Sequence, residues 1–471
     1  MPIGDLSPEI AIIVAAVLAL LFAAFAPRRW QAGAALIALA GILVAATLLV
    51  QQIGETRFTF SGTWAIDGAS IWARLMILFA TAFCILLSPG WFRTDPRHGE
   101  YYTILLLSAL GAMAMAGAGD LLQLVIAVLL SSVTGYTLAA WHRDWALSVE
   151  AGMKYFLMGA LANALLVTGV ALVLGLLGDS GYTALSATFA AGVTPSPLLF
   201  VGFALTLVGV AFKLGAVPAQ AWLPDVAEGA PVPSAAFLTV VPKIGAAIAM
   251  ARLVQLVPPD ALGLRPLLAV MAALTMTVGN LAALWQDDVR RLIGWSSVAQ
   301  AGYLLMAVTV LGLSPDALMA VLAFVASYAI GNLAAFAVVA HLRGRTAIAD
   351  YAGLARRQPI AAAALVLAFL SLVGIPPTVG FLGKLTLFLT TMQGGYLWLA
   401  LLAAANTAAS LFYYARIMGT MYFGTPPDTV EVLDRLSGVA MWAAAIAVLG
   451  GAVVAQFAFA AFRVSTLLPM W

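Results

Sequence analysis

Long apolar stretches separated by short polar loops dominate the pattern of this chain. A helix that crosses a lipid bilayer needs about 20 mostly apolar residues. Fourteen such runs are predicted, at 7–26, 31–51, 68–89, 101–118, 120–141, 149–177, 198–221, 233–257, 266–285, 293–313, 315–341, 359–393, 396–423 and 437–462. The pattern therefore predicts an all-α polytopic membrane protein with about 14 transmembrane helices.

Two of these runs are interrupted by glycine and proline. The seventh run (198–221) and the twelfth run (359–393) contain the breaks, which lie at Gly215, Pro218, Gly374, Pro376 and Pro377. Such breaks persist in a membrane only where protein or a water-filled cavity satisfies the freed backbone groups. The broken runs are five apart. This spacing predicts two five-helix repeats, runs 4–8 and runs 9–13, with the second copy inverted.

The chain is accordingly divided into four parts. Residues 1–100 are expected to form an N-terminal three-helix segment and 424–471 a C-terminal helix, with the two inverted repeats at 101–257 and 258–423. The first ten residues include two acids and no basic residue. The positive start of a cleavable signal is therefore missing, and the first run is expected to remain as an anchor.

The composition excludes several classes of protein. Hydrophobic residues make up 63% of the chain and charged residues 9%, against roughly 25% charged in soluble domains. The net charge of +2 offers no basic face for phosphates, so no nucleic-acid partner is expected. One cysteine and three histidines argue against a metal site, and no metal is expected.

The 22 basic residues divide into 18 Arg and 4 Lys. Twelve Arg lie in the loops that follow the odd-numbered runs, and three lie in the loops on the opposite side. Because cytoplasmic loops carry the excess of basic residues, both termini are predicted on the non-cytoplasmic side.

The four lysines all lie inside apolar runs, at Lys154, Lys213, Lys243 and Lys384. A charge at the bilayer centre costs about 2.5–3.5 kcal/mol on insertion scales, which suggests a function for each. A desolvated lysine can lose its proton, whereas arginine stays charged, so the pattern favours a proton path. Snorkelling to the interface is the alternative. It is strongest for Lys154, which Glu150 could pair with at i, i+4.

Other polar residues are weaker candidates. His341 ends its run beside Arg343 and is read as interfacial, and Arg416 is either a charge partner or a snorkelling side chain. Most of the Trp and Tyr residues are expected to be interfacial anchors.

The segments around the lysines resemble subunit N of bacterial respiratory complex I. The matching motifs are KYFLMG (154–159), FKLGAVP (212–218), WLPD (222–225), EGAP (228–231), PK (242–243), GNLAAL (279–284), GIPP (374–377) and GFLGK (380–384). They occur in the family's order and cover most of the chain.

The resemblance implies an antiporter-like proton-translocating subunit in the membrane arm of an NADH:quinone oxidoreductase. Lys154 would be the lysine that holds the proton of the first half-channel, and Lys213 would be the connecting residue at the first helix break. Lys243 would be the central relay, and Lys384 would be the terminal lysine of the second half-channel. NADH, FMN, iron–sulfur clusters and quinone would be bound by partner subunits and none by this chain. Antiporter-like neighbours and small helical subunits would be its partners. It would lie in the bacterial inner membrane, with both termini periplasmic.

Two positions depart from the family. Leu129 stands where relatives have a glutamate that partners the lysine of the next helix, so Glu150, Asp120 or a neighbouring chain would have to substitute. Gln300 stands where a histidine is common and cannot titrate, which weakens the link between the halves. Two alternatives stay open: a homologous subunit of a membrane-bound hydrogenase, formate hydrogenlyase or multi-subunit cation/proton antiporter, and a structural subunit that does not pump.

Overall fold

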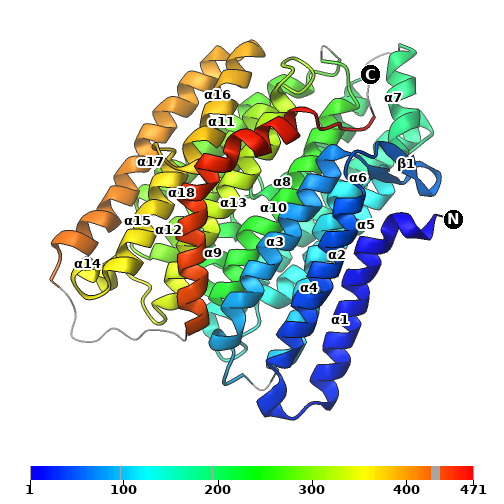
Figure 1. Ribbon diagram of the computed structural model, residues 1–471. Helices are drawn as coiled ribbons and strands as arrows, with labels where there is room; N and C mark the ends of the chain where they lie inside the picture. The colour runs from blue at the N-terminus through cyan, green and yellow to red at the C-terminus, as the bar shows by residue number, and fades with distance from the viewer. Residues whose placement is uncertain (1, 96, 193–195, 260, 426–434, 470–471) are drawn as a thin grey trace.

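The structure is a computed structural model that describes residues 2–95, 97–192, 196–259, 261–425 and 435–469. Its long helices run side by side in one bundle (Figure 1). Within the described residues, thirteen helices are long and apolar enough to cross a membrane. The predicted run 359–393 is instead a pair of 15-residue helices, α15 and α16, separated at the predicted break. The helical membrane fold is confirmed.

The first seven crossings are α1 (Ser7–Phe25), α2 (Gly33–Gln51), α3 (Gly68–Trp91), α4 (His98–Gly117), α5 (Leu121–Ala139), α6 (Ala146–Leu177) and α8 (Pro197–Leu214). The others are α10 (Val232–Gln255), α11 (Leu264–Leu284), α12 (Val289–Thr309), α13 (Ala317–His341), the pair α15 (Pro359–Val373) and α16 (Val379–Gln393), α17 (Leu397–Phe423) and α18 (Arg435–Arg463).

Short elements connect these crossings. They are the helices α7 (Tyr182–Ala190), α9 (Trp222–Gly229) and α14 (Leu354–Arg357), and four 3₁₀ turns at Ile3–Leu6, Arg28–Trp30, Phe60–Gly62 and Ile348–Tyr351. A two-stranded antiparallel hairpin pairs β1 (Arg57–Thr59) with β2 (Trp64–Ile66), with Phe58 opposite Ala65. The expectation of an all-α chain missed this hairpin, whose strands are too short to produce a hydrophobic alternation.

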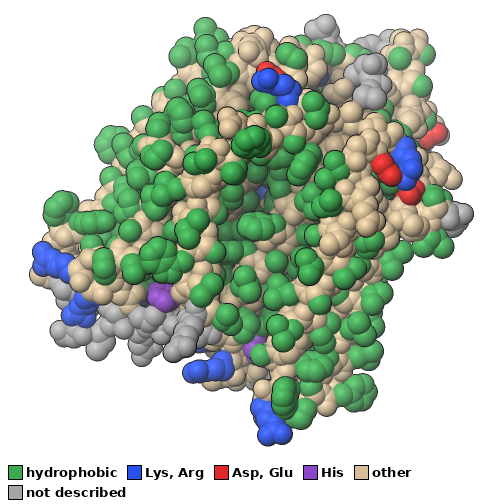
Figure 2. Space-filling view, viewed as in Figure 1, with side chains coloured by type: hydrophobic (Ala, Val, Ile, Leu, Met, Phe, Trp, Pro, Cys, Tyr) green, Lys and Arg blue, Asp and Glu red, His purple; other side chains and the backbone are tan. Residues whose placement is uncertain are grey.

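Three helices form the interior of the bundle. The most apolar stretch of α10 is completely buried, and the corresponding stretches of α12 and α13 are almost completely buried. In α6 and α18 most of this stretch is exposed. Apolar side chains cover much of the outer surface (Figure 2), as expected where lipid replaces water. Helices from all four predicted segments pack on one another. The segment boundaries and the inverted repeat therefore remain predictions.

Both chain ends lie at the same end of the bundle (Figure 1). The segment that follows α2 joins them. Gln52 donates a hydrogen bond to the Asp5 carbonyl at 3.0 Å, and the hydroxyls of Thr56 and Thr466 are 3.1 Å apart. This arrangement fits an even number of crossings.

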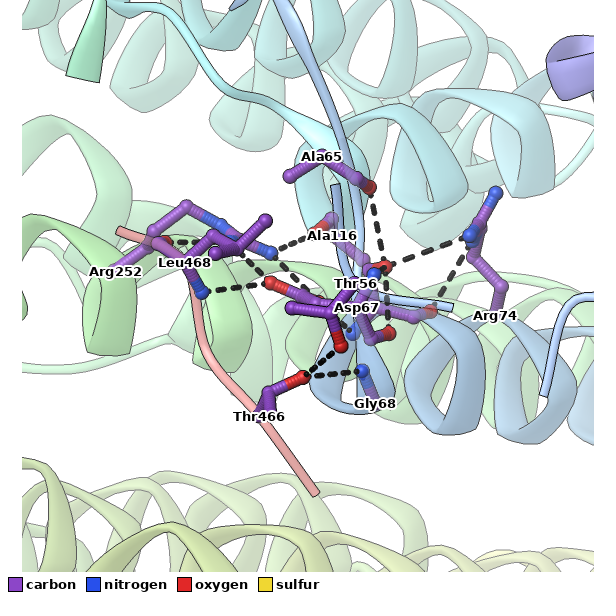
Figure 3. Close-up of polar contacts among 10 residues, drawn as sticks. Thr56, Ala65, Asp67, Gly68, Arg74, Ala116, Arg252, Thr466 and Leu468 are labelled. Atoms are coloured by element: carbon purple, nitrogen blue, oxygen red, sulfur yellow. Dashed lines mark hydrogen bonds and ion pairs between the residues drawn. The ribbon is translucent and has the colours of Figure 1, made fainter. Parts of the chain in front are cut away.

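A fully buried ion pair ties the C-terminal segment to the bundle (Figure 3). Nη1 of Arg252, in the last turns of α10, lies 2.6 Å from the carboxylate of Asp67, which precedes α3. The same guanidinium donates to the carbonyls of Leu468 and Ala116, and the Leu468 amide donates to Asp67 at 2.8 Å. The ends of α3, α4 and α10 and the C-terminal segment therefore meet at one ion pair.

The electrostatics of this carboxylate follow from its partners. Burial alone would raise the pKa of Asp67, but the Arg252 guanidinium and hydrogen bonds from the Leu468 and Ser70 amides hold it below its ordinary value. A second buried pair, Arg74 with Glu9 at 3.1 Å, joins α3 to α1. Acids at the starts of α1 and α3 are therefore buried, each beside an arginine of another helix.

We predict that Arg252→Gln lowers the free energy of unfolding by about 3–5 kcal/mol, because it leaves the buried Asp67 charge unpaired. The double variant Asp67→Asn/Arg252→Gln should recover part of that loss. Thermal unfolding in detergent, followed by circular dichroism, measures both. A double variant no more stable than the single one would contradict the pairing argument.

Candidate functional site

The first helix break is closed by residues from both sides of it. Helix α8 ends at Leu214 and is capped by Gly215, whose φ is +68°. A Cβ added to Gly215 would lie 2.6 Å from Leu223. The indole of Trp222, at the start of α9, donates to the Phe212 carbonyl at 3.0 Å. The amide of Val217 donates to the Thr275 hydroxyl of α11 at 3.0 Å. The break is thereby fixed against the second half of the chain.

Lys213 lies in the last turn of α8 and is completely buried. Its ammonium is 3.3 Å from the Tyr155 hydroxyl and 5.4 Å from the Tyr155 ring centre. Trp222 stacks on that ring at 4.1 Å. The Phe212 ring centre is also 5.4 Å from the ammonium, so the cation is held by the Tyr155 hydroxyl and by the rings of Tyr155 and Phe212.

The second break frees two carbonyls whose partners come from elsewhere in the bundle. In a continuous helix the carbonyls of Leu372 and Val373 would accept from residues 376 and 377, which are both proline and carry no N–H. Gln300 of α12 donates to the Leu372 carbonyl at 2.9 Å. Lys384 of α16 donates to the Val373 carbonyl at 3.0 Å. A glutamine and a lysine thus replace the missing backbone donors.

Lys384 is fixed on its other sides as well. Gly374 has a φ of +92°, and an added Cβ there would lie 2.9 Å from Cδ of Lys384. The ammonium lies 4.3 Å from the ring centre of Tyr303 on α12. The side chain is 4% exposed, so it is enclosed between the break and α12.

Lys243 lies on the enclosed helix α10, and its hydrogen-bond partners among the described residues are neutral. Its ammonium donates to the carbonyl of Ser297 and, at 2.7 Å, to the hydroxyl of the same residue. That hydroxyl is 2.6 Å from the hydroxyl of Tyr328, which donates to the Thr239 carbonyl. A chain of polar groups therefore links α10, α12 and α13 around this lysine.

Lys154 differs from the other three lysines. It is half-exposed on α6, and its ammonium lies 2.7 Å from Glu150 and 3.2 Å from Asp225. Asp225 also pairs with Arg291, which in turn pairs with Glu228. The predicted i, i+4 pair is present. In the part of the chain that the structure describes, the ion pairs of lysines within 4.0 Å all involve Lys154.

The chain thus supplies counter-charges for Lys154 without an acid on α5. Leu129 lies on α5 and is 38% exposed. Asp120 caps that helix and accepts from the Ser180 hydroxyl at 2.6 Å, so of the two acids proposed as substitutes it is Glu150 that contacts the lysine. Asp225, in the short helix α9 after the first break, was not expected.

A row of polar side chains lies between Ser296, the sequence neighbour of Ser297, and Tyr303, whose ring contacts Lys384. The hydroxyls of Ser296 and Tyr414 are 2.5 Å apart, and the Tyr414 ring lies beside that of Tyr413, with ring centres 4.5 Å apart. Tyr413 donates to Asn280 at 3.0 Å, whose amide donates to Tyr303 at 3.2 Å. The row starts beside the serine that binds Lys243 and ends at the ring that contacts Lys384. It passes around Gln300 through α17 and α11.

Two other predicted residues lie away from this arrangement. His341 is 3.2 Å from the Ser437 hydroxyl, at the junction of α13 and α18. Arg416 is 3.6 Å from Asp287, whose side chain is 93% exposed. Both are peripheral.

The expectation that tyrosines act mainly as interfacial anchors is wrong for the interior. Tyr155, Tyr303, Tyr413 and Tyr414 are all buried and lie in the site. Hydropathy does not show which side of a helix a tyrosine occupies. The adjacent pair at 413–414 and Asn280 within an apolar run were the signals present in the sequence. Among the described residues, no group of three or more His, Cys, Asp or Glu could hold a metal ion.

The comparisons with known proteins decide the family. A family model described as "NADH:quinone oxidoreductase/Mrp antiporter, TM" matches residues 118–410, more than half of the chain. NADH-quinone oxidoreductase subunit N 1 of Streptomyces griseus is 43% identical over 447 residues, covering 94% of this chain and 92% of that protein. The chain belongs to the subunit N family of NADH-quinone oxidoreductase.

Further relatives agree with this assignment. Subunit N of a Mycobacterium species is 43% identical over 425 residues, covering 90% of this chain and 89% of that one. A chain in the structure of respiratory complex I from Thermus thermophilus with bound aureothin has a TM-score of 0.83 and 29% identity, covering 97% of this chain and 99% of that one. The fold of this complex I chain therefore extends over nearly the whole of the present chain.

We predict that Gly374→Ala lowers the free energy of unfolding by about 1–3 kcal/mol. A side chain at φ +92° is strained, and its Cβ would press on Lys384. Gly419→Ala in α17 is the matched control, because its Cβ would meet nothing within 4 Å. Thermal midpoints of the two purified variants test the difference. Equal midpoints would show that the break does not need glycine.

Proposed function

We propose that this chain is the antiporter-like proton-translocating membrane subunit of a complex I type NADH:quinone oxidoreductase, with a lysine relay as its proton path. Redox chemistry in other subunits would drive it. The observation that carries the proposal is the burial of Lys213, Lys243 and Lys384 among neutral donors and acceptors in a chain of the subunit N family.

The chemistry of lysine supports a relay. An ammonium group can release its proton to a neighbouring acceptor and take up another, whereas a guanidinium stays charged. Holding three lysines among neutral groups costs insertion energy that a scaffold would have no reason to bear. The Tyr155 hydroxyl beside Lys213 and the Ser297 hydroxyl beside Lys243 can each donate and accept a hydrogen bond, as a proton-transfer step requires.

The order of residues gives the proposed route. Lys154 and its acidic partners form the outer cluster, and Tyr155 on the same helix contacts Lys213. Lys243 follows as the central relay. The tyrosine–asparagine row is proposed to take over the connecting role expected of a histidine, and Lys384 ends the route. Gln300 would keep the terminal lysine in place by occupying the neighbouring carbonyl.

The cofactors of the reaction are assigned to other subunits. NADH, FMN, iron–sulfur clusters and quinone would be bound there, and neighbouring antiporter-like and small helical subunits would contact the exposed faces of the bundle. We place the chain in the bacterial inner membrane, with its arginine-rich loops cytoplasmic and both termini periplasmic.

One observation favours a second function. Leu129 on α5 stands where relatives have the glutamate that partners the lysine of the next helix. The loss of this acid fits a structural subunit that no longer pumps. The acidic partners of Lys154 and the three enclosed lysines favour translocation instead.

We predict that Lys243→Ala abolishes the contribution of this subunit to proton pumping, because the variant lacks the central group that binds a proton. The measurement is the proton-to-electron ratio of the assembled complex in vesicles. Arg416→Gln is the control, since that cation is peripheral, and should pump normally. A wild-type ratio in the lysine variant, with assembly intact, would exclude the relay role.

We further predict that Tyr414→Phe lowers the proton-to-electron ratio, because the phenyl ring keeps the packing but interrupts the row at Ser296. Tyr182→Phe is the matched control: it also removes a buried phenol hydroxyl, but in α7, away from the row. The same reduction in both variants would indicate a packing effect and contradict the proposed connection.

A further inference from the structure

Two neighbouring cavities open at the arginine-rich end of the bundle and share two residues, Arg97 and Arg143. The first has a volume of about 420 Å³ and lies between the end of α3, the α5–α6 loop and the segment after α13. The second has a volume of about 400 Å³ and lies between α1, α4 and α5. Basic side chains gather at this end of the molecule (Figure 2).

The second cavity continues from these arginines along an apolar wall. Leu20 of α1 and Ile104 and Leu107 of α4 line it. Because α4 rises 1.5 Å per residue, the wall reaches several turns beyond the arginines into the membrane-spanning part of the helix. A groove with charge at its mouth and an apolar interior has the two chemistries of a phospholipid, a phosphate and an acyl chain.

The first cavity adds features of a membrane–water interface. The guanidinium of Arg343 stacks over the Trp91 ring at 4.7 Å, and the Trp91 indole donates to His142 at 3.1 Å. Burial lowers the pKa of His142 to about 4, so its ring is neutral at pH 7. Tryptophan with arginine is typical of the headgroup level.

The fixed charges of the two cavities balance. Arg97, Arg143 and Arg343 stand against the carboxylates of Asp95, Asp144 and Glu100. Arg97 is only 3.9 Å from Asp95 and donates to the Trp141 carbonyl. A purely anionic headgroup would meet three carboxylates here, whereas a headgroup with a phosphate and an ammonium finds a partner for each charge.

We propose that Arg97 and Arg143 bind the phosphate of an aminophospholipid, whose ammonium faces Glu100 and whose acyl chain lies along Leu20, Ile104 and Leu107. Arginine forms paired hydrogen bonds with phosphate, and basic pockets between membrane helices are known to hold headgroups. The site is separate from the lysines, so it does not depend on the proposed proton path.

The test is the amount of lipid retained by the full-length chain purified in detergent and assayed by mass spectrometry. Wild-type protein exchanged with an equal mixture of phosphatidylethanolamine and phosphatidylglycerol should retain the amine lipid preferentially. Arg97→Gln/Arg143→Gln should weaken retention about 30-fold, because each arginine contributes about 1 kcal/mol of attraction to the headgroup. The control Arg28→Gln/Arg29→Gln removes two exposed arginines that line neither cavity and should retain lipid normally.

Two further arms identify the chemistry. Glu100→Gln should remove the preference for the amine lipid while leaving total retention nearly unchanged. Inorganic phosphate alone should not displace the lipid, because it lacks the acyl chain. The proposal is overturned if both arginine pairs lose lipid equally, if phosphatidylglycerol is retained in preference, or if free phosphate displaces the lipid.

Discussion

The structure depends on one constraint: a backbone carbonyl inside a membrane must find a donor. Pro376 and Pro377 leave two consecutive carbonyls without N–H partners. The side chains of Gln300 and Lys384 donate hydrogen bonds to these carbonyls instead. This requirement fixes both α12 and α16 against the end of α15, and the ammonium of Lys384 lies over the Tyr303 ring. The break in the helix is therefore what positions the terminal lysine of the proposed route.

The bundle contains two kinds of buried charge, and they serve different purposes. Arg252 forms an ion pair with Asp67 and donates hydrogen bonds to two backbone carbonyls. It therefore joins the helices to the C-terminal segment as a fixed charge. The three enclosed lysines have neutral partners instead. A paired guanidinium stabilises one arrangement, whereas an ammonium among hydroxyls and carbonyls can change its proton occupancy without leaving a counter-charge unpaired.

The sequence predicts the crossings, the breaks and the local Glu150–Lys154 pair because each depends on neighbours in the chain. It does not predict contacts between distant segments. Asp67 and Arg252 are 185 residues apart, and Ser296 and Tyr414 are 118 apart. The role of Gln300 was likewise hidden, because it depends on a carbonyl in another helix. Hydropathy identifies a membrane helix but does not show which of its polar residues face inward.

The proton-to-electron ratio of the assembled complex carrying Lys384→Arg tests the central claim most directly. Arginine keeps a positive charge and donors for the Val373 carbonyl, but it does not release a proton under physiological conditions. If lysines carry protons through this subunit, the variant should assemble and lose the protons contributed by this chain. A ratio equal to that of the wild type would mean that Lys384 is only a structural donor at the helix break.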